Sequence, residues 1–274
     1  MTLNCQGHLL DLTVPKVMGI LNVTPDSFYD GGRYTSLSDT LKQAERLLQE
    51  GATFLDIGGY SSKPHAAEVS LEEELQRVLP VVKAIRQSFP TALLSIDTFR
   101  SAVAQAVLDE GVAMVNDITA GADEQMFQTV AAFHVPYVMM HMRGTPQTMT
   151  SLTQYENLLQ EIGYYFADKI NQVKAAGITD YLIDPGFGFA KTIDQNFELL
   201  NHLEHFHCLN APLLIGVSRK SMIYKTLQST PDLAVNGSTF LHAIALSKGA
   251  KILRVHDVKE AVECITLHQK LQQV

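Results

Sequence analysis

Two pairs of cationic residues in this chain have the types and spacing needed to bind an anion. Arg254 and His256 are two residues apart at the end of an apolar run, so their side chains share one face of a strand. Arg219 and Lys220 place two adjacent cations at the end of another apolar run, where a helical stretch begins. Cations beside a helix N-terminus suit a phosphate group or an electron-rich ring edge.

Acidic and amide side chains form a third group, because Asp97, Asn116 and Asp184 also follow apolar runs. Such groups can bind the N–H-rich edge of a heterocycle through two-point hydrogen bonds. Residues 185–189 read Pro-Gly-Phe-Gly-Phe, which predicts a sharp turn whose rings can stack on a planar ligand. The spacing of these residues is not that of a metal cage. Asn22 offers one hard oxygen, and one such ligand plus substrate phosphates often holds Mg²⁺.

The apolar runs predict the element that positions these side chains. A short apolar run between helical patterns is typical of a strand buried on both faces of a parallel sheet. Eight such units predict a single-domain α/β fold over residues 1–274, a (β/α)8 TIM barrel, whose strand ends meet at one mouth where active sites of this fold lie. The runs are Val17–Leu21, Phe54–Ile57, Leu93–Ile96, Met114–Val115, Tyr137–Met140, Tyr181–Ile183, Leu213–Val217 and Lys251–Val255.

Local signals mark the ends of the helices and the closed end of the barrel. Ser70 precedes three consecutive glutamates, which indicates a helix N-terminus. The residues 9–12 predict part of a small β-hairpin that plugs the bottom of the barrel. Glycines that follow helices and precede strands predict helix C-terminal caps; they are Gly51, Gly111, Gly177 and Gly249.

Composition narrows the class of protein. The 274 residues carry a net charge of −8, which argues against a nucleic-acid partner. Cys5, Cys208 and Cys264 are far apart and form no C-x-x-C, which argues against a zinc site or disulfide framework and fits a reducing cytosol. No signal-peptide pattern and no run of about 18 apolar residues is found, so we expect a cytoplasmic protein without a membrane span.

Eight ordered blocks of the chain resemble the signatures of the dihydropteroate synthase family, pterin-binding barrel enzymes of the folate pathway. One block alone is a weak signal, but together they cover essentially the whole chain in the expected order. The blocks are Val17–Phe28, Asp56–Gly59 with the loop that follows, Ser95–Thr98, Val115–Ile118, Met140–Met142, the turn at Asp184, Ser218–Ser221 and Arg254–Asp257.

The resemblance implies a transferase reaction. In this family, 6-hydroxymethyl-7,8-dihydropterin diphosphate condenses with p-aminobenzoate to give 7,8-dihydropteroate and diphosphate. The mechanism is similar to an SN1 displacement and requires no protein nucleophile. The resemblance also implies Mg²⁺ as cofactor, small-molecule substrates, sulfonamides as inhibitors and a homodimer.

Three sets of binding residues are carried over by position. The pterin set is Asp97, Asn116, Met140, Asp184, Lys220 and Arg254. The diphosphate set is Asn22, Arg254 and His256, with Mg²⁺ at Asn22. The p-aminobenzoate set is Phe28, Ser62, Lys63, Pro64, Phe189, Arg219 and Ser221. The resemblance implies catalytic roles for Asp97, Asp184, Lys220, Arg254 and His256, and supporting roles are expected for Asp56, Asp117 and His141.

The loop after the second strand departs from the family pattern. Tyr60, Lys63 and His65 stand where the family usually has Glu, Arg and Gly. Lysine cannot make the planar, bidentate contact of arginine, so this loop is expected to change the affinity for p-aminobenzoate and sulfonamides. Two alternative functions fit the barrel and its pterin contacts: the pterin-binding domain of a corrinoid methyltransferase, and a pterin-binding protein without activity. A Schiff-base aldolase that uses Lys220 lacks any sign of a carbonyl substrate.

Overall fold

The computed structural model of the chain describes residues 1–23, 37–60 and 68–273. Eight parallel strands close into a barrel in which each is hydrogen-bonded to its neighbours, in the order β10-β3-β4-β5-β6-β7-β8-β9. This closed barrel confirms the fold predicted from the apolar runs. The strands are β3 (Lys16–Asn22), β4 (Phe54–Gly58), β5 (Leu93–Asp97), β6 (Met114–Asp117), β7 (Tyr137–Met140), β8 (Tyr181–Asp184), β9 (Leu213–Ile215) and β10 (Ala250–Val255).

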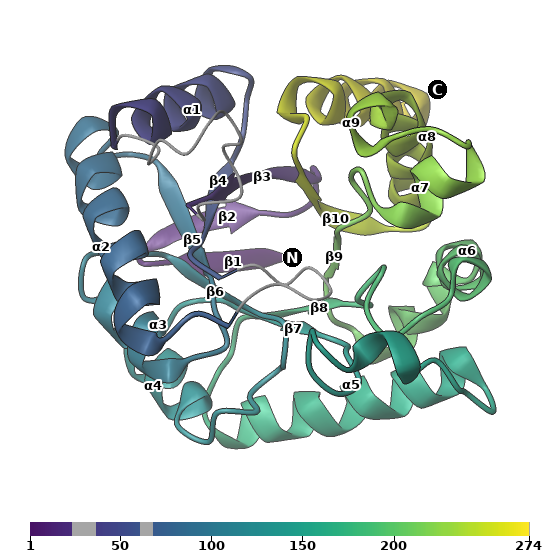
Figure 1. Cartoon of the computed structure of the whole chain (residues 1–274), viewed down its shortest axis with the longest axis horizontal. Coiled ribbons are helices and arrows are strands. Elements are labelled where there is room, and N and C mark those ends of the chain that lie inside the picture. Colours follow the sequence, from purple (N-terminus) through teal and green to yellow (C-terminus); the bar gives the residue numbers. More distant parts are fainter. Residues whose placement is uncertain (24–36, 61–67, 274) are drawn as a thin grey trace.

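Helices surround the barrel and cover its outer face (Figure 1). None of the helices in the described ranges is long and apolar enough to cross a membrane. The α-helices are α1 (Leu37–Gln49), α2 (Leu71–Ser88), α3 (Ser101–Leu108), α4 (Met126–Phe133), α5 (Leu158–Ala175), α6 (Ile193–Asn201), α7 (Ser221–Thr226), α8 (Val235–Ser247) and α9 (Val258–Gln272). Shorter 3₁₀ turns are η2 (Met149–Ser151), η3 (Leu203–Leu209) and η4 (Pro231–Leu233).

The space between strands and helices is filled by aliphatic side chains. Leu55 and Ile57 of β4 are fully buried, as are Val78 and Val82 of α2, and all four belong to one continuous core. Burying each side chain of this size contributes about 1.5–3 kcal/mol. This outer core fixes each strand relative to its helix, so the strand ends become rigid supports for the site.

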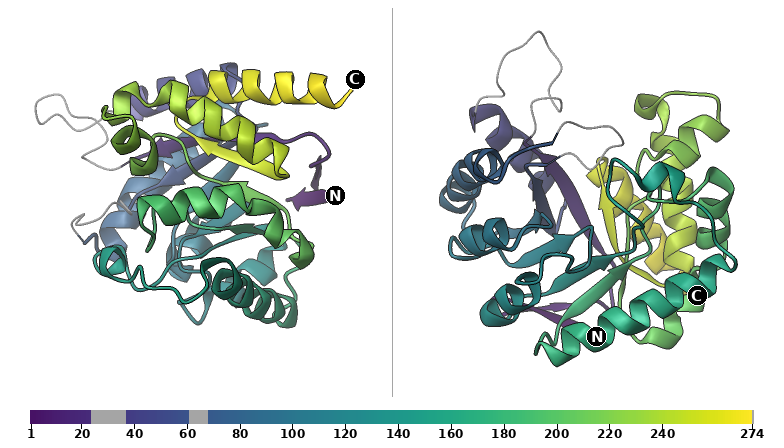
Figure 2. Two further views of the ribbon diagram at one scale, coloured as in Figure 1. Left: turned by 90° about the vertical axis from the view of Figure 1, so that its right-hand side faces the viewer. Right: turned by 60° about the horizontal axis from the view of Figure 1, so that its bottom comes forward.

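An N-terminal hairpin closes the bottom of the barrel. Strands β1 (Thr2–Cys5) and β2 (His8–Asp11) pair antiparallel and lie at one end of the barrel (Figure 2). Leu3, Cys5 and Leu12 are buried in one cluster with barrel residues that include Met18 and Phe54. The predicted hairpin plug is therefore confirmed, with the second strand ending at Asp11.

Strand register explains why polar residues gather at the other end. In neighbouring strands Gly58 is paired with Asp97, Asp97 with Asn116, and Met140 with Asp184. Alternate residues of a strand point to the same face, so these side chains form one layer inside the mouth. Asp56 lies two residues below Gly58 and is fully buried. The barrel interior therefore changes from apolar at the hairpin to polar at the mouth.

The predicted helix ends agree with the structure. The hydroxyl of Ser70 accepts a hydrogen bond from the Glu73 amide at 3.1 Å and caps α2. The four predicted cap glycines all have positive φ, between 86° and 102°. One strand is shorter than expected: β9 ends at Ile215 rather than Val217, and it pairs with β8 only at Leu213. The chain leaves the ladder there, and Gly216 instead lines the mouth.

Candidate active site

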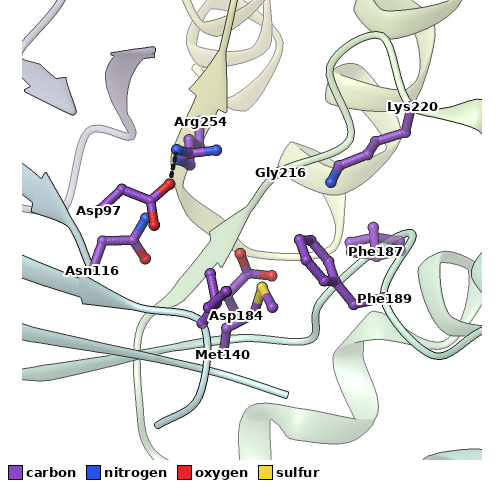
Figure 3. A pocket seen from close by; sticks show the side chains of 10 residues that line it. Asp97, Asn116, Met140, Asp184, Phe187, Phe189, Gly216, Lys220 and Arg254 are labelled. Carbon is purple, nitrogen blue, oxygen red and sulfur yellow. Dashed lines mark hydrogen bonds and ion pairs between the residues drawn. The ribbon is translucent and has the colours of Figure 1, made fainter. Parts of the chain in front are cut away.

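A pocket of about 390 Å³, partly open to solvent, lies at the C-terminal ends of the strands. Figure 3 shows acidic and amide groups on one side of this pocket and a lysine with two phenylalanines on the other. The lining residues are Asp97, Asn116, Ile118, Met140, Asp184, Phe187, Phe189, Gly216, Lys220 and Arg254.

Arg254 is held between two carboxylates. Its Nε lies 2.6 Å from Asp56 Oδ2, and its Nη2 lies 2.6 Å from Asp97 Oδ2. Asn116 donates its side-chain amide to the same oxygen of Asp56 at 3.1 Å. Burial opposes the charge on Arg254, but the two carboxylates outweigh it and raise the pKa of the guanidinium above its usual value. The guanidinium is therefore a permanent cation, and these bonds fix its orientation.

Burial raises the pKa values of both acids in the pocket. Burial raises the pKa of Asp97 to about 7, although the adjacent Arg254 lowers it. Burial also raises the pKa of Asp184, although that carboxylate accepts a hydrogen bond from the Gly186 amide at 2.8 Å. Both carboxylates therefore gain from a ligand that donates hydrogen bonds to them.

Lys220 faces these acids across the pocket (Figure 3). Its ammonium lies 4.4 Å from the centre of the Phe189 ring, within the range of a cation–π contact. Burial, assisted by Arg254, lowers the pKa of Lys220 to about 8. The stem of Lys220 passes close to Gly188, where a Cβ would lie 3.2 Å from Lys220 Cδ. Glycine at 188 therefore leaves the path of the lysine open.

Arg219 and Lys220 are adjacent in sequence but separate in space. Arg219 has a φ of +54°, and its guanidinium makes a two-point ion pair with Asp257, at 2.9 and 2.6 Å. A further contact joins it to Asp232 at 3.5 Å. Arg219 thus stands outside the pocket lining, while Lys220 enters it.

His256 lies at the exposed rim and its ring Nδ1 is 3.3 Å from the Ser218 hydroxyl. Partial desolvation and the charges of Arg254 and Arg219 lower its pKa below the usual value. The ring is therefore neutral at pH 7 until an anion approaches, and an anion would raise this pKa.

The pocket brings together the whole pterin set predicted from the sequence, together with Phe189. Asn22, Arg219, Ser221 and His256 stand outside its lining. The remaining predicted residues lie outside the described part of the chain; they are Phe28, Ser62, Lys63 and Pro64.

Three residues that line the pocket were absent from the binding sets predicted from the sequence: Ile118, Phe187 and Gly216. Asp56, for which a supporting role was expected, lies outside the lining and holds Arg254. Phe187 stood in the alternating Phe-Gly-Phe pattern, which was a usable signal. Ile118 follows Asn116 and Asp117 in one of the eight blocks, but nothing in its type indicated a site.

The fold and pocket define a class of protein: a (β/α)8 barrel whose mouth suits a flat heterocycle that donates hydrogen bonds, with cationic side chains nearby that suit an anionic group. Three features support this conclusion: the two acids that line the pocket, the arginine fixed by ion pairs, and the lysine placed over a phenylalanine ring.

Comparison with known proteins narrows the class. The pattern that describes pterin binding enzymes matches residues 18–256. The dihydropteroate synthase of Escherichia coli strain K12 is 46% identical over 267 residues, which cover 97% of this chain and 94% of that protein. A crystal structure of Yersinia pestis dihydropteroate synthase with a sulfonamide drug has a TM-score of 0.95 at 44% identity and covers both chains completely.

A second solved structure, Xanthomonas albilineans dihydropteroate synthase with 4-aminobenzoic acid, has a TM-score of 0.93 at 40% identity. It covers 100% of this chain and 98% of that one. The chain therefore belongs to the pterin binding enzyme family and, within it, to the dihydropteroate synthases, which are transferases. The relatives do not favour the corrinoid methyltransferase alternative.

Proposed function

We propose that the described pocket binds the pterin of 6-hydroxymethyl-7,8-dihydropterin diphosphate, and that the chain condenses this substrate with p-aminobenzoate to give 7,8-dihydropteroate and diphosphate. The observation that carries the proposal is the pocket itself, where Asp97, Asn116 and Asp184 face Lys220. The acids and the amide supply acceptors for the N–H groups of a pterin edge. Arg254 offers a fixed planar cation for stacking on the ring.

The proposed condensation depends on stabilising the charges that develop on the two substrate fragments, and it needs no protein nucleophile. The C–O bond to diphosphate breaks first, its electrons leave with the diphosphate, and a pterin-methyl cation remains. The lone pair of the p-aminobenzoate amine then forms the new C–N bond, and the amine gives up a proton to solvent water. Lys220 and Arg254 stabilise the departing anion, while Asp97 and Asp184 stabilise the positive heterocycle. His256 at the rim becomes protonated as the diphosphate approaches.

Mg²⁺ belongs to the same proposal. Asn22 ends β3 beside Gly58, where a Cβ would lie 3.5 Å from the Asn22 amide oxygen. Within the described ranges, no group of three or more His, Cys, Asp or Glu could hold a metal ion. One amide oxygen fits an ion whose other ligands are diphosphate oxygens and water. When bound, Mg²⁺ neutralises charge on the departing diphosphate.

The p-aminobenzoate is proposed to lie beside Phe189 and near the start of α7, where Ser221 and Arg219 are found. The ion pair of Arg219 with Asp257 holds that guanidinium near the rim. Phe28, Ser62, Lys63 and Pro64 complete this proposed set from outside the described residues. Sulfonamides, which share the arylamine shape, are proposed to compete for the same place.

A coupled assay tests the function directly. Diphosphate release should require both substrates and Mg²⁺, and 7,8-dihydropteroate should appear in equal amounts. Pterin binding without turnover would contradict the proposal and favour the inactive pterin-binding alternative. Transfer of a methyl group to a corrinoid partner, with no diphosphate released, would favour the methyltransferase.

The pH profile of kcat/KM should be bell-shaped. Activity rises as pH rises through about 7, because the raised pKa of Asp97 leaves its carboxylate protonated below that value. Activity falls above about 8, where Lys220 loses its proton. Steady-state rates of wild type, Asp97→Asn and Lys220→Arg check this assignment. The first variant should lose the acidic limb and the second should move the basic limb upward. Limbs that persist unchanged in both variants would contradict it.

We also propose that the enzyme is a cytoplasmic homodimer. Its three cysteines are free thiols, which fits a reducing compartment. Large apolar side chains are exposed on α8 and α9: Phe240 is 65% exposed, Leu267 68% and Leu271 72%. Exposed apolar side chains on adjoining helices favour an interface between copies.

Sedimentation velocity checks the homodimer. The molar mass derived for the wild type should be twice the chain mass of 30.3 kDa. Phe240→Asp should shift the protein toward the monomer. Tyr164→Asp is the matched control, because Tyr164 is 68% exposed but lies on α5. A monomeric wild type, or equal dissociation by both variants, would contradict this interface.

A further inference from the structure

Lys191 is a buried lysine in the loop between β8 and α6, with only 8% of its surface exposed. Its ammonium nitrogen lies 3.0 Å from each of three acceptors: the Gly186 carbonyl, the Phe189 carbonyl and His141 Nδ1. A lysine ammonium has three N–H donors and no acceptor, so each donor has a partner. Such complete pairing offsets the cost of burying the charge.

His141 takes part as a neutral ring. Burial, assisted by the charge of Lys191, lowers its pKa well below the usual value. Nδ1 must therefore offer a lone pair to Lys191, and the ring proton sits on Nε2. His141 directly follows β7, and its backbone amide donates to the Asp184 carbonyl at 2.9 Å. The lysine thus ties the end of β7 to the loop that follows β8.

That loop has a conformation that needs support. Gly186 and Gly188 have φ of 73° and 80°, and Ala190 has φ of 49°, which an alanine adopts only at a cost in free energy. The loop also passes so close to β7 that a Cβ at Gly186 would lie 2.0 Å from the His141 carbonyl oxygen. The hydrogen bonds from Lys191 to the Gly186 and Phe189 carbonyls hold this loop in its conformation.

The same loop carries three pocket groups, namely Asp184 at its start, then Phe187 and Phe189. Lys191 does not line the pocket itself, so it can reach the ligand only through these residues. Burial lowers the pKa of Lys191 to about 7, and the nearby carboxylate of Asp184 partly opposes this shift. Further support comes from the Tyr155 hydroxyl, which donates to the Ala190 carbonyl at 3.0 Å.

We propose that Lys191 is a positioning residue of the synthase: its three bonds hold the loop after β8 in the shape that sets Asp184, Phe187 and Phe189 around the pterin. This inference rests on the proposed function of the pocket. Lys191 needs to perform no chemistry, because every donor on its ammonium is directed at the loop or at His141.

Lys191→Met tests the inference, because methionine has a similar length and no donors. We expect its Kd for the dihydropterin diphosphate, measured by calorimetry, to rise by about 10- to 100-fold, as for other residues that orient a binding group. The KM for this substrate should rise and kcat should fall. Hydrogen exchange should quicken in peptides that cover residues 185–190, and peptides from α1 to α3 should keep wild-type rates.

A destabilised control separates positioning from general loss of stability. Phe206→Leu thins the fully buried core, where the Phe206 ring packs edge-on against Phe166 of α5, and Phe206 is not among the residues that line the pocket. It should lower Tm and leave the pterin Kd at the wild-type value. His141→Phe removes one of the three acceptors and keeps an aromatic ring at this position, so its effect on Kd should be smaller than that of Lys191→Met. This variant also decides the inference if Lys191→Met does not fold.

A wild-type pterin Kd in Lys191→Met, or in a folded His141→Phe when the lysine variant does not fold, would overturn the inference. A Phe206→Leu variant that weakens pterin binding as much as Lys191→Met would also overturn it. If the wild-type protein binds pterin without turnover, the proposed function fails alone, and the comparison of Kd values still decides the role of Lys191. If the wild type binds no pterin, both proposals are contradicted.

Discussion

Arg254→Met should lower kcat/KM by about 10³-fold and also destabilise the fold by about 3–5 kcal/mol. Arg254 is the shared partner of Asp56 and Asp97, each at 2.6 Å, and Asp56 is fully buried. Removing the guanidinium leaves two acids in the barrel mouth without their cation. Loss of one partner of a buried ion pair is strongly destabilising, because the other charge stays buried and uncompensated. It also removes the fixed cation proposed to face the pterin and its diphosphate.

Urea unfolding and steady-state kinetics measure the two effects separately. Arg46→Met is a matched control, because Arg46 also pairs with an acid at 2.6 Å but its side chain is 50% exposed. This control should change the free energy of unfolding by less than about 1 kcal/mol and leave kcat/KM unchanged. Adding Asp56→Asn to Arg254→Met should recover part of the stability and none of the activity. A stable, active Arg254→Met variant would contradict both the ion-pair argument and the proposed role.

The barrel was predictable because its strands are buried on both faces and are therefore almost wholly apolar in sequence. The polar residues at their ends stood out against these runs, so Asp97, Asn116 and Asp184 were recognisable before their arrangement was known. Parallel strands with a common direction then place such residues at one mouth. The main error in bounds was at β9, which ends early because the chain turns away at Gly216.

The pairing of these residues was not predictable in the same way. Asp56 is separated from Arg254 by 198 positions and Asp97 by 157, and both acids were plausible partners for any cation at the mouth. Arg219 and Lys220 show a second limit. Their adjacency suggested one cationic patch, but the positive φ of Arg219 sends its side chain to Asp257 instead of the pocket.

Lys191 shows a third limit of sequence reasoning. In the sequence it is an ordinary lysine just before a helix, and lysines in such positions are usually exposed. Its burial depends on carbonyls that a chain with positive φ at Gly186, Gly188 and Ala190 turns toward it. Contacts to backbone carbonyls leave no trace in residue types, so only the folded loop reveals them.

Asp184→Asn should separate activity from stability in the opposite sense to Arg254→Met. In the wild type the Gly186 amide donates a hydrogen bond to Asp184 Oδ1 at 2.8 Å, and the amide oxygen of the variant can still accept this bond. Its NH₂ group would then face the pterin N–H donors, where two donors cannot pair. An unpaired polar contact in a buried site should lower kcat/KM by about 10³-fold or more.

Stability should not fall in this variant, and the sign follows from the direction of the pKa shift. Burial raises the pKa of Asp184 in the folded state. A carboxyl with a raised pKa stabilises the fold below its unfolded pKa, and that contribution is lost as pH rises through the folded value. Near neutral pH the wild type therefore has the cost of a buried charge, which the neutral amide does not have.

The free energy of unfolding of Asp184→Asn should accordingly equal or exceed that of the wild type at pH 8, and the difference should shrink toward pH 5. Urea titrations at both pH values, with kcat/KM measured on the same preparations, check this. A variant that loses both stability and activity would mean that Asp184 mainly supports the loop after β8. A stable variant without activity would show that Asp184 serves pterin binding and lowers the stability of the fold, as expected for a buried carboxylate that accepts hydrogen bonds from the pterin.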